Sequence, residues 1–382
     1  MSANNKGQNV ANAPLLRFPE FKDEWKICTI SDFGKIITGN TPSTKDTSLY
    51  GEDYLWASPA DLGTNKFITE TNTKLSQKGF EKTRKLPKDS ILVTCIGSTI
   101  GKMGMASRDM ATNQQINAII VNNDVDCHFA YYAIQSRFPK YMLSVAVQAV
   151  PIISKSNFEK LCNYRPTTEE QNKIGALLSL IDKRIELQRS AIEKLKSLKS
   201  AIREKQFKQI IKKVDLNYKV SDVLRYEQPI KYIVSDTEYS DDKSLTPVLT
   251  ANQAFILGYT DEKTGVYSKG HCIIIDDFTL DCKYVDFAFK VKSSAIKILT
   301  ANDDNLLRYL YEYLNFLNLS SSEHKRHYIS EIEPMKICLP DEDTILKVAS
   351  LMKSIDKKIE SENCSLNNLI NQKKYLLSKM FI

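Results

Sequence analysis

The chain has 382 residues, a formal net charge of +7, 42% hydrophobic and 26% charged residues. This length predicts two or three domains, and the composition is that of an ordinary globular protein. With only 13 glycines and 12 prolines, collagen-like and Pro/Gly-rich disordered chains are excluded. No apolar stretch reaches the roughly 18 residues that a membrane span needs, so we expect no membrane association.

The N-terminus and the cysteines indicate where the protein works. Residues 1–14 are polar and lack the apolar segment of a signal peptide, and we expect them to be disordered. None of the eight cysteines belongs to a C-x-x-C pair, and several lie in apolar runs. They are therefore interpreted as reduced core thiols of a cytoplasmic protein.

The first globular segment, residues 15–165, has the pattern of a mixed α/β domain. Strands are predicted at residues 35–38, 90–96 and 115–121, and a helix at 128–141. A long helix without internal proline follows at residues 166–213, and it begins just after a proline with acidic residues in its first turn.

The second globular segment, residues 214–339, has a comparable pattern. Strands are predicted at 247–250, 272–275, 285–291 and 295–299, and a helix at 303–317. Both segments end with a helix, a polar loop, an Ile-Ser pair, a strand, a proline and a long helix, which in the second case covers residues 340–382. Their remaining sequences barely match.

The two long helices are copies of one another. Residues 166–207 align without a gap with residues 340–381, at a spacing of 174 residues. A spacing this large is no solenoid period and indicates duplication of a whole domain-plus-helix unit. The predicted fold is therefore mixed α/β, with two globular domains separated by two long helices and related by a pseudo-two-fold repeat.

Both helices carry a 4,3 alternation of apolar residues that is typical of a coiled coil. The polar interruptions coincide, Gln188 with Glu362 and Lys199 with Lys373, and polar seam residues often fix the register. Because the repeat implies two-fold symmetry, we expect antiparallel pairing; the alternative is that each helix packs only on its own domain. The predicted seam consists of Ile174, Leu178, Ile181, Ile185, Ile192, Leu195, Ile202, Val348, Met352, Ile355, Ile359, Leu366, Leu369 and Leu376.

The charge is unevenly distributed along the chain. Residues 167–213 contain 12 Lys/Arg against 6 Asp/Glu, whereas residues 214–340 contain 14 against 19. A moderate basic excess is compatible with nucleic-acid binding, but the acidic second segment argues against a uniformly basic surface.

Motifs for catalysis are missing from the sequence. We find no Gly-rich S-adenosylmethionine loop and no N-P-P-Y-type methylation motif. Residues 97–103 (GSTIGKM) are one residue too short for a P-loop, and Met103 replaces the hydroxyl that binds Mg²⁺. Asp276, Asp277 and Asp281 are interpreted as a strand end or turn rather than a metal site. We therefore predict no cofactor, no metal and no catalytic residue.

Five stretches of the chain carry a family resemblance: residues 15–33 (LLRFPEFKDEWKICTISDF), 39–43 (GNTPS), 86–104 (LPKDSILVTCIGSTIGKMG), 113–121 (NQQINAIIV) and 154–186 (SKSNFEKLCNYRPTTEEQNKIGALLSLIDKRIE). They resemble specificity subunits of type I restriction–modification systems. The resemblance is strongest in the first segment and the two helices, and the second segment lacks a clean counterpart of the NQQ motif.

The resemblance implies a non-catalytic, sequence-specific DNA-binding subunit. Residues 15–165 and 214–339 would be two target-recognition domains, each reading half of a bipartite site in double-stranded DNA. The helices 166–213 and 340–382 would set the half-site separation and dock two methyltransferase subunits, with restriction subunits joining through the complex. Adenine methylation and ATP-dependent cleavage would then belong to the partners.

Polar and basic loop residues are the candidates for DNA contact, because phosphates attract Lys, Arg and hydroxyls, and base edges attract amides and hydroxyls. In the first segment they are Thr41, Ser43, Thr44, Lys45, Ser98, Thr99, Lys102, Asn113, Gln114, Gln115 and Gln148. In the second they are Asn252, Gln253, Lys269, Lys283, His324, Lys325, Arg326 and His327. The alternative for these residues is that they belong to solvated loops without a ligand. The alternative functions for the protein are a coiled-coil scaffold that joins two protein-binding domains, or an enzyme.

Overall fold

The computed structural model describes residues 12–143, 151–250, 254–319 and 325–382. These residues form two compact units. Unit 1 comprises Met1–Ser190 together with Cys364–Ile382, and unit 2 comprises Ala191–Asn363. Each unit therefore contains one globular segment and one part of each long helix.

The described part of unit 1 contains three sheets, with strand orders β2-β9-β6-β7-β4, β5-β3-β8 and β1-β10. Helix α2 packs on the largest sheet, and β10 leads into the first long helix. The elements are β1 (Lys26–Thr29), η1 (Ile30–Asp32), β2 (Gly34–Thr38), η2 (Thr47–Leu49), β3 (Tyr50–Ala57), η3 (Pro59–Asp61), β4 (Phe67–Ile68), β5 (Thr73–Leu75), α1 (Gln77–Glu81), β6 (Ile91–Thr94), β7 (Met103–Ala106), β8 (Ala111–Thr112), β9 (Ile116–Val121), α2 (Cys127–Met142), α3 (Lys155–Glu159) and β10 (Cys162–Arg165).

Among the residues of unit 2 that the structure describes there are also three sheets, with strand orders β12-β18-β15-β16, β14-β13-β17 and β11-β19. Its elements are β11 (Leu216–Lys219), α5 (Val220–Val223), β12 (Arg225–Glu227), η4 (Ile230–Tyr232), β13 (Thr246–Leu249), β14 (Ile256–Thr260), β15 (Cys272–Asp276), β16 (Cys282–Val285), β17 (Lys290–Val291), β18 (Ile296–Thr300), α6 (Asp304–Leu317), a π-helical turn (Tyr328–Ile332) and β19 (Lys336–Cys338).

The two units share one topology although their sequences diverge. The order β2-β9-β6-β7 in unit 1 corresponds strand by strand to β12-β18-β15-β16 in unit 2. In the smaller sheets, β3 pairs antiparallel with β5 and parallel with β8, and β13 pairs in the same way with β14 and β17. The pseudo-repeat predicted from the long helices is therefore confirmed for the domains as well.

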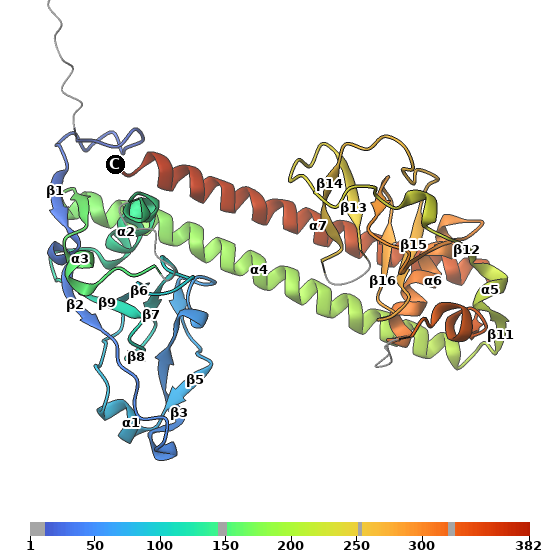
Figure 1. Cartoon of the computed structure of the whole chain (residues 1–382), viewed down its shortest axis with the longest axis horizontal. Coiled ribbons are helices and arrows are strands. Elements are labelled where there is room, and N and C mark those ends of the chain that lie inside the picture. The colour runs from blue at the N-terminus through green and yellow to red at the C-terminus, as the bar shows by residue number, and fades with distance from the viewer. Residues whose placement is uncertain (1–11, 144–150, 251–253, 320–324) are drawn as a thin grey trace, which may run out of the picture. The chain divides into compact units, whose positions relative to one another are not determined.

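The long helices are α4 (Thr168–Ile211) and α7 (Glu342–Lys379), and they lie side by side in each unit (Figure 1). In unit 1 the first part of α4 packs beside the end of α7, with Lys373 ion-paired to Asp182. In unit 2 the end of α4 packs beside the start of α7, with Lys199 ion-paired to Asp356. The helices are thus antiparallel, as the repeat predicted.

Each unit has an aromatic core that includes the long helices. In unit 1, Trp25 packs edge-on against Phe129 of α2 and against Phe381, which follows α7. In unit 2, Phe207 of α4 is fully buried against Tyr309 and Tyr313 of α6. Burial of side chains this large contributes about 1.5–3 kcal/mol each, so the helices are integral parts of both cores.

Most expected elements are present, and the differences are local. The expected strand at residues 285–291 is wrong, because β16 ends at Val285 and β17 begins only at Lys290. A short helix, α3, lies between the first Ile-Ser pair and β10. Of the segment 1–14, for which disorder was expected, residues 1–11 lie outside the described residues. The expected domain boundaries remain predictions.

Two general expectations concern the thiols and the membrane. All eight cysteines are free, and burial raises the pKa of the Cys95 thiol to about 12, so this thiol stays protonated. Among the helices of the described ranges, none is both long and apolar enough to span a bilayer.

Gly175 lies where α4 packs closely on the N-terminal cap of α2, and this contact can be tested by substitution. A Cβ atom there would lie 2.2 Å from Oδ1 of Asp126, the residue that caps α2 by accepting a hydrogen bond from the Phe129 amide. Although alanine is the better helix former by about 1 kcal/mol, we expect Gly175→Ala to destabilise unit 1 by about 1–3 kcal/mol through overpacking. Denaturant unfolding followed by tryptophan fluorescence measures this.

The matched control is Ser190→Ala at an exposed position of the same helix in unit 1, which should change stability by no more than about 0.5 kcal/mol. Stabilisation by Gly175→Ala would contradict the close packing of α4 on the α2 cap.

Candidate nucleic-acid interface

Three predicted loops of unit 1 meet at one end of its large sheet. Thr38, the last residue of β2, pairs with Asn117 of β9, and Thr94, the last residue of β6, pairs with Ile116. The loops that follow β2 and β6 therefore emerge beside the loop that precedes β9. These are residues 39–46, 95–102 and 113–115, which together we call the unit 1 edge.

Hydrogen bonds connect the loops of the unit 1 edge. The Thr41 hydroxyl donates to Oε1 of Gln114 at 2.5 Å, and Nε2 of Gln115 donates to the Ile96 carbonyl at 3.5 Å. Gly39 allows the close approach, since a Cβ atom there would lie 2.2 Å from the Asn113 carbonyl oxygen. The edge is therefore a joined surface rather than three independent loops.

Most predicted residues of this edge are accessible. Thr41, Ser43, Thr44, Lys45, Ser98, Lys102 and Gln114 are exposed, and Thr99 and Gln115 are half-buried. Asn113 is only 7% exposed and accepts a hydrogen bond from the Gln115 amide. It therefore shapes the loop, and we remove it from the residues that can reach a ligand.

The glycine-bounded loop is a hairpin turn between β6 and β7. Its closure rests on a hydrogen bond from the Gly101 amide to the Thr94 carbonyl. Gly101 has a φ of +90°, and a Cβ there would lie 2.7 Å from the Phe138 ring. A P-loop instead connects a strand to a helix, so this loop lacks the architecture as well as the spacing for phosphate cradling.

A basic segment missed by the sequence analysis borders the same edge. Arg84 donates its backbone amide to Oδ1 of Asn40 and its guanidinium to the Thr38 carbonyl, while Asn40 donates to the Lys82 carbonyl. Lys82, Arg84 and Lys85 are exposed. The sequence signal was the run Lys-Thr-Arg-Lys at positions 82–85, whose contact with residues 38–40 could not be read from the chain alone.

Shared topology identifies the corresponding edge of unit 2. Asp276, the last residue of β15, pairs with Ile296, the first of β18. The loops at 277–281 and 292–295 thus occupy the places of 95–102 and 113–115. The exposed residues there include Thr279, Lys292 and Ser293, none of which the sequence analysis selected.

The basic residues predicted after α6 in unit 2 have different roles. Arg326 is exposed and donates to Ser294 at 3.4 Å, with Asp277 3.9 Å away. Lys325 is also exposed and lies 3.2 Å from Glu331. His327 is only 2% exposed and donates its backbone amide to the side chain of Asp277 at 3.2 Å. His327 is therefore withdrawn as a surface contact.

The acidic residues Asp276 and Asp277 form a turn and an ion pair. Oδ1 of Asp276 accepts from the amides of Phe278 and Thr279 and forms the turn after β15. Asp277 is buried and ion-paired with Lys297 at 3.1 Å. In the described part of the chain, no group of His, Cys, Asp or Glu has the arrangement of a metal site.

The remaining predicted residues do not gather at one place. Lys269 is exposed and ion-paired with Glu227 at 2.9 Å, and Lys283 is half-buried on β16. The predictions for Gln148, Asn252, Gln253 and His324 lie outside the described residues.

The predicted seam is present but varies in depth. Ile174, Leu178, Ile181, Ile185, Ile192, Val348 and Met352 are buried. Leu195, Ile202, Ile355, Ile359, Leu366, Leu369 and Leu376 are half-buried. The seam is thus deepest where the domains add their own apolar side chains.

Two lysine–aspartate ion pairs lie at the seam, and the 174-residue repeat relates one pair to the other. Asp182 and Lys199 recur as Asp356 and Lys373. Lys373 lies 2.7 Å from Asp182 in unit 1, and Lys199 lies 2.7 Å from Asp356 in unit 2. Each lysine therefore pairs with the aspartate of the other helix, which fixes the register twice.

In unit 1 a residue of the globular domain joins this pair. The Tyr132 hydroxyl of α2 donates to Asp182 at 2.5 Å. The ammonium of Lys66, which precedes β4, lies 4.3 Å from the centre of the Tyr132 ring and bonds to the Tyr132 and Ser179 hydroxyls. Burial lowers the pKa of Lys66 to about 8. We call this group the unit 1 joint.

In unit 2 the corresponding group is fully ionic. Arg308 of α6 bonds to Asp356 and, at 2.6 Å, to Glu312. Glu312 has no exposed side-chain surface and also pairs with Lys199 at 3.1 Å and Arg203 at 2.8 Å. We call this group the unit 2 joint; the sequence analysis found neither joint beyond the seam lysines.

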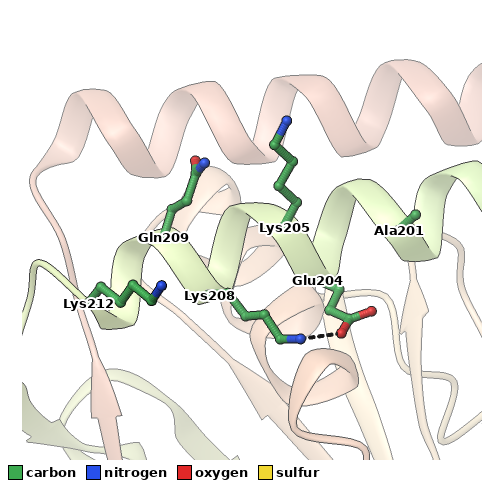
Figure 2. A pocket seen from close by; sticks show the side chains of 6 residues that line it. All are labelled: Ala201, Glu204, Lys205, Lys208, Gln209 and Lys212. Carbon is green, nitrogen blue, oxygen red and sulfur yellow. Dashed lines mark hydrogen bonds and ion pairs between the residues drawn. The ribbon is translucent and has the colours of Figure 1, made fainter.

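One face of α4 in unit 2 is open and basic (Figure 2). It forms a shallow pocket lined by Ala201, Glu204, Lys205, Lys208, Gln209 and Lys212. Lys208 bonds to Glu204 at 2.5 Å, and Figure 2 shows Lys205 pointing away from that pair. This face combines three lysines with one glutamate and one side-chain amide, Gln209, so its net charge is positive.

These features define a protein that presents two different polar edges on one duplicated, helix-linked framework. Residues 22–197 match the family model described as the type I restriction modification DNA specificity domain. Over this part the chain resembles type I restriction–modification specificity (S) subunits.

Curated relatives match over part of their length. The chain is 45% identical over 142 residues to a type I restriction enzyme specificity subunit of Escherichia coli, covering 36% of this chain and 35% of the relative. It is 35% identical over 150 residues to such a subunit of Haemophilus influenzae, covering 38% and 32%. The matched segments thus span only about a third of these relatives.

Solved structures share the fold over nearly the whole chain. The type I restriction–modification S subunit from M. genitalium matches with a TM-score of 0.63 at 17% identity, covering 97% of this chain and 99% of that one. A chain from a study of type I R-M complex assembly matches with a TM-score of 0.51 at 12% identity, covering 93% and 97%. At these identities the likeness establishes the fold.

Because the unit 2 joint contains ionised carboxylates, we expect the stability of unit 2 to fall at acidic pH. Burial by itself would raise the pKa of Asp356, but hydrogen bonds from Lys199 and Arg308 outweigh it and hold this pKa below its usual value. A lowered pKa in the folded state stabilises the protein above the unfolded pKa of about 4, and this contribution is lost as the pH falls through the folded value. We expect Asp356→Asn to cost about 1–2 kcal/mol at pH 7, towards the lower end because the carboxylate is 36% exposed.

Calorimetric unfolding of both proteins between pH 7 and pH 2 checks this, and the difference should shrink below about pH 4. Asp343→Asn on the exposed surface of the same helix is the control, with a change within about 0.5 kcal/mol. If the difference in unfolding free energy between the parent and Asp356→Asn does not depend on pH, the charge of Asp356 contributes nothing to stability.

Proposed function

We propose that the chain is the DNA-reading subunit of a type I restriction–modification complex, and that each unit reads one half of a bipartite duplex site. The observation that carries this proposal is the shared topology of the two units combined with different side chains at the equivalent edges. A duplicated framework keeps the geometry of reading constant, while divergent edges select different bases. The chain itself is non-catalytic in this proposal, and methylation and cleavage belong to partner subunits in the cytoplasm.

In unit 1 the edge residues divide into two roles. Thr41, Gln114 and Gln115 carry the hydroxyl and amide groups that read base edges. Lys82 and Arg84, together with Lys45, supply the positive charge that binds phosphates without sequence preference. This division explains why polar amides and exposed cations lie on adjoining segments.

The long helices give this protein its second proposed task, which is to hold the two recognition units at a set separation and to dock two modification subunits. Leu180 and Leu187 of α4 are 59% and 61% exposed and lie seven residues apart, which places them on one face of the helix. Exposed leucines in a row are characteristic of protein contact surfaces. A scaffold that binds only proteins is the competing function, and DNA binding separates the two.

Removing the basic segment tests phosphate binding in unit 1. We expect Lys82→Ala combined with Arg84→Ala to weaken duplex binding for every sequence and to reduce the slope of log K against log salt by about 0.9 for each lost contact. Fluorescence anisotropy with labelled duplex at several salt concentrations measures it.

Lys347→Ala, an exposed lysine paired with Asp343 on α7, is the matched control and should leave the slope unchanged. Arg326→Ala is the corresponding change at the edge of unit 2. An unaltered slope in the double variant would exclude residues 82–85 from the interface.

Exchange of a unit tests modular reading. The repeat places equivalent junctions near Pro166 and Pro340. A chimera with a foreign second globular domain between the helices should retain the first half-site and change the second. Mapping of methylated adenines in cells that carry the chimera and its partner subunits measures the outcome, and a change in both half-sites would contradict it.

A further inference from the structure

The two joints can be aligned by the helix caps and by the repeat of the long helices. Asp126 caps α2 and Asp303 caps α6. Glu312 lies nine residues after Asp303, and Gln135 lies nine residues after Asp126. The buried carboxylate of unit 2 is thus replaced by a neutral amide in unit 1, where Tyr131 and Leu377 also replace Arg308 and Arg203.

That carboxylate balances three cations in unit 2. Glu312 is fully buried and pairs with Lys199, Arg203 and Arg308. Buried charges require such partners, because an unpaired one costs several kcal/mol. In unit 2 the anion is therefore part of the fold.

In unit 1 the equivalent place opens on a cavity of about 900 Å³. Gln135 lines it, and its buried Oε1 has no hydrogen-bond partner among the described residues. Carboxylates are few in the lining, with Asp182 already paired to Lys373 and Glu186 as the second. The cations that line it are Lys66, Lys102, Lys183, Arg189, Lys373 and Lys374.

Among these cations, Lys66 has a partly buried ammonium that is not paired with any carboxylate that the structure describes. Its ammonium is held by two hydroxyls and by the faces of the Tyr131 and Tyr132 rings, at 5.5 and 4.3 Å. Within the described residues, no carboxylate lies within ion-pair distance of it. A ligand that carries negative charge would complete this environment as Glu312 completes the other.

We propose that the cavity of unit 1 binds a phosphate group, which takes the place that the Glu312 carboxylate fills in unit 2. Several lysine and arginine side chains around one void match the multiple charged oxygens of a phosphate. An amide presents either its oxygen or its nitrogen, so Gln135 serves as a neutral partner to the same group. Apolar lining residues such as Phe67 and Ile370 accommodate the organic part of a phosphate ester.

The phosphate belongs either to a small molecule or to the backbone of DNA, and the binding chemistry is the same. The proposal rests on the charges of unit 1 alone and does not require that the edges read DNA. Its test therefore begins without DNA.

Thermal unfolding of the full chain, followed by tryptophan fluorescence, tests the site with inorganic phosphate as the probe. The chain has 2 tryptophans, and both, Trp25 and Trp56, lie in unit 1. We expect 10 mM phosphate, compared with chloride at equal ionic strength, to raise the transition of unit 1 by about 2–4 °C. Lys66→Met should abolish the shift, and Lys88→Met, exposed and outside the cavity, should keep it.

The charge-swap variants give the sharper comparison. Gln135→Glu supplies the missing carboxylate, so it should raise the transition without phosphate and remove the response to phosphate. Glu312→Gln should create a phosphate response in unit 2, seen by calorimetry. Because phosphate also stabilises proteins by exclusion from their surface, the measured quantity is the difference between each variant and the parent.

If inorganic phosphate has no effect, the same variants are compared with short duplex DNA as the probe. A DNA-induced shift that is lost in Lys66→Met assigns the site to a backbone phosphate. Equal shifts in the parent, Lys66→Met and Gln135→Glu, with phosphate and with DNA, would overturn the proposal. DNA affinity of Lys66→Met that stays at the parent value while its phosphate shift is lost would leave the proposed reading function intact.

Discussion

The structure depends on a reciprocal ion pair between two antiparallel helices. Lys199 on α4 reaches Asp356 on α7, and their repeat mates Lys373 and Asp182 make the same contact. Polar contacts in an apolar seam tolerate only one register, since a shifted helix would leave a buried charge unpaired. The same aspartates also accept hydrogen bonds from Tyr132 of α2 and from Arg308 of α6. One carboxylate in each unit thus links helix register to the seating of the globular domain.

The sequence predicted the parts of this arrangement that depend on local periodicity. The 4,3 alternation located the seam, and the gapless repeat implied duplication and antiparallel pairing. Apolar runs such as Cys272–Asp276, where every residue is buried, were recognisable as central strands. The expected strand at 285–291 failed because its pattern continues through residues 286–288, all of which are exposed between β16 and β17. The sequence also did not predict which residues pair with Lys199 and Lys373. Their partners, Asp182 and Asp356, come one residue after a seam position and are not part of the seam pattern.

The candidate site was predictable only where polar loop residues lie at the surface. Thr41 and Gln114 were selected from the sequence and meet in the structure at 2.5 Å. Asn113 and His327 were selected for the same reason but are buried, because loop composition does not reveal which side chain turns inward to satisfy the backbone. The sequence analysis missed the edge loops of unit 2, because these loops correspond to those of unit 1 in their strand connections but not in their sequences. Recognising them required the strand order.

Divergence within a fixed framework explains both the edges and the joints. Apart from β4, the strand orders of the two units correspond, and the lysine–aspartate pairs are the same, so the positions that differ can change without loss of the fold. At the edges the differing residues are exposed, and their exchange costs little stability. Inside the joints the exchange is coupled, because unit 1 lacks both the buried carboxylate of Glu312 and two of the cations that it balances, Arg203 and Arg308. The cavity beside Lys66 is lined by more cations than carboxylates, and it has the space for another anion. The joint of unit 1 is therefore the place in this fold where a bound ligand could strengthen the attachment of a recognition unit to the helices.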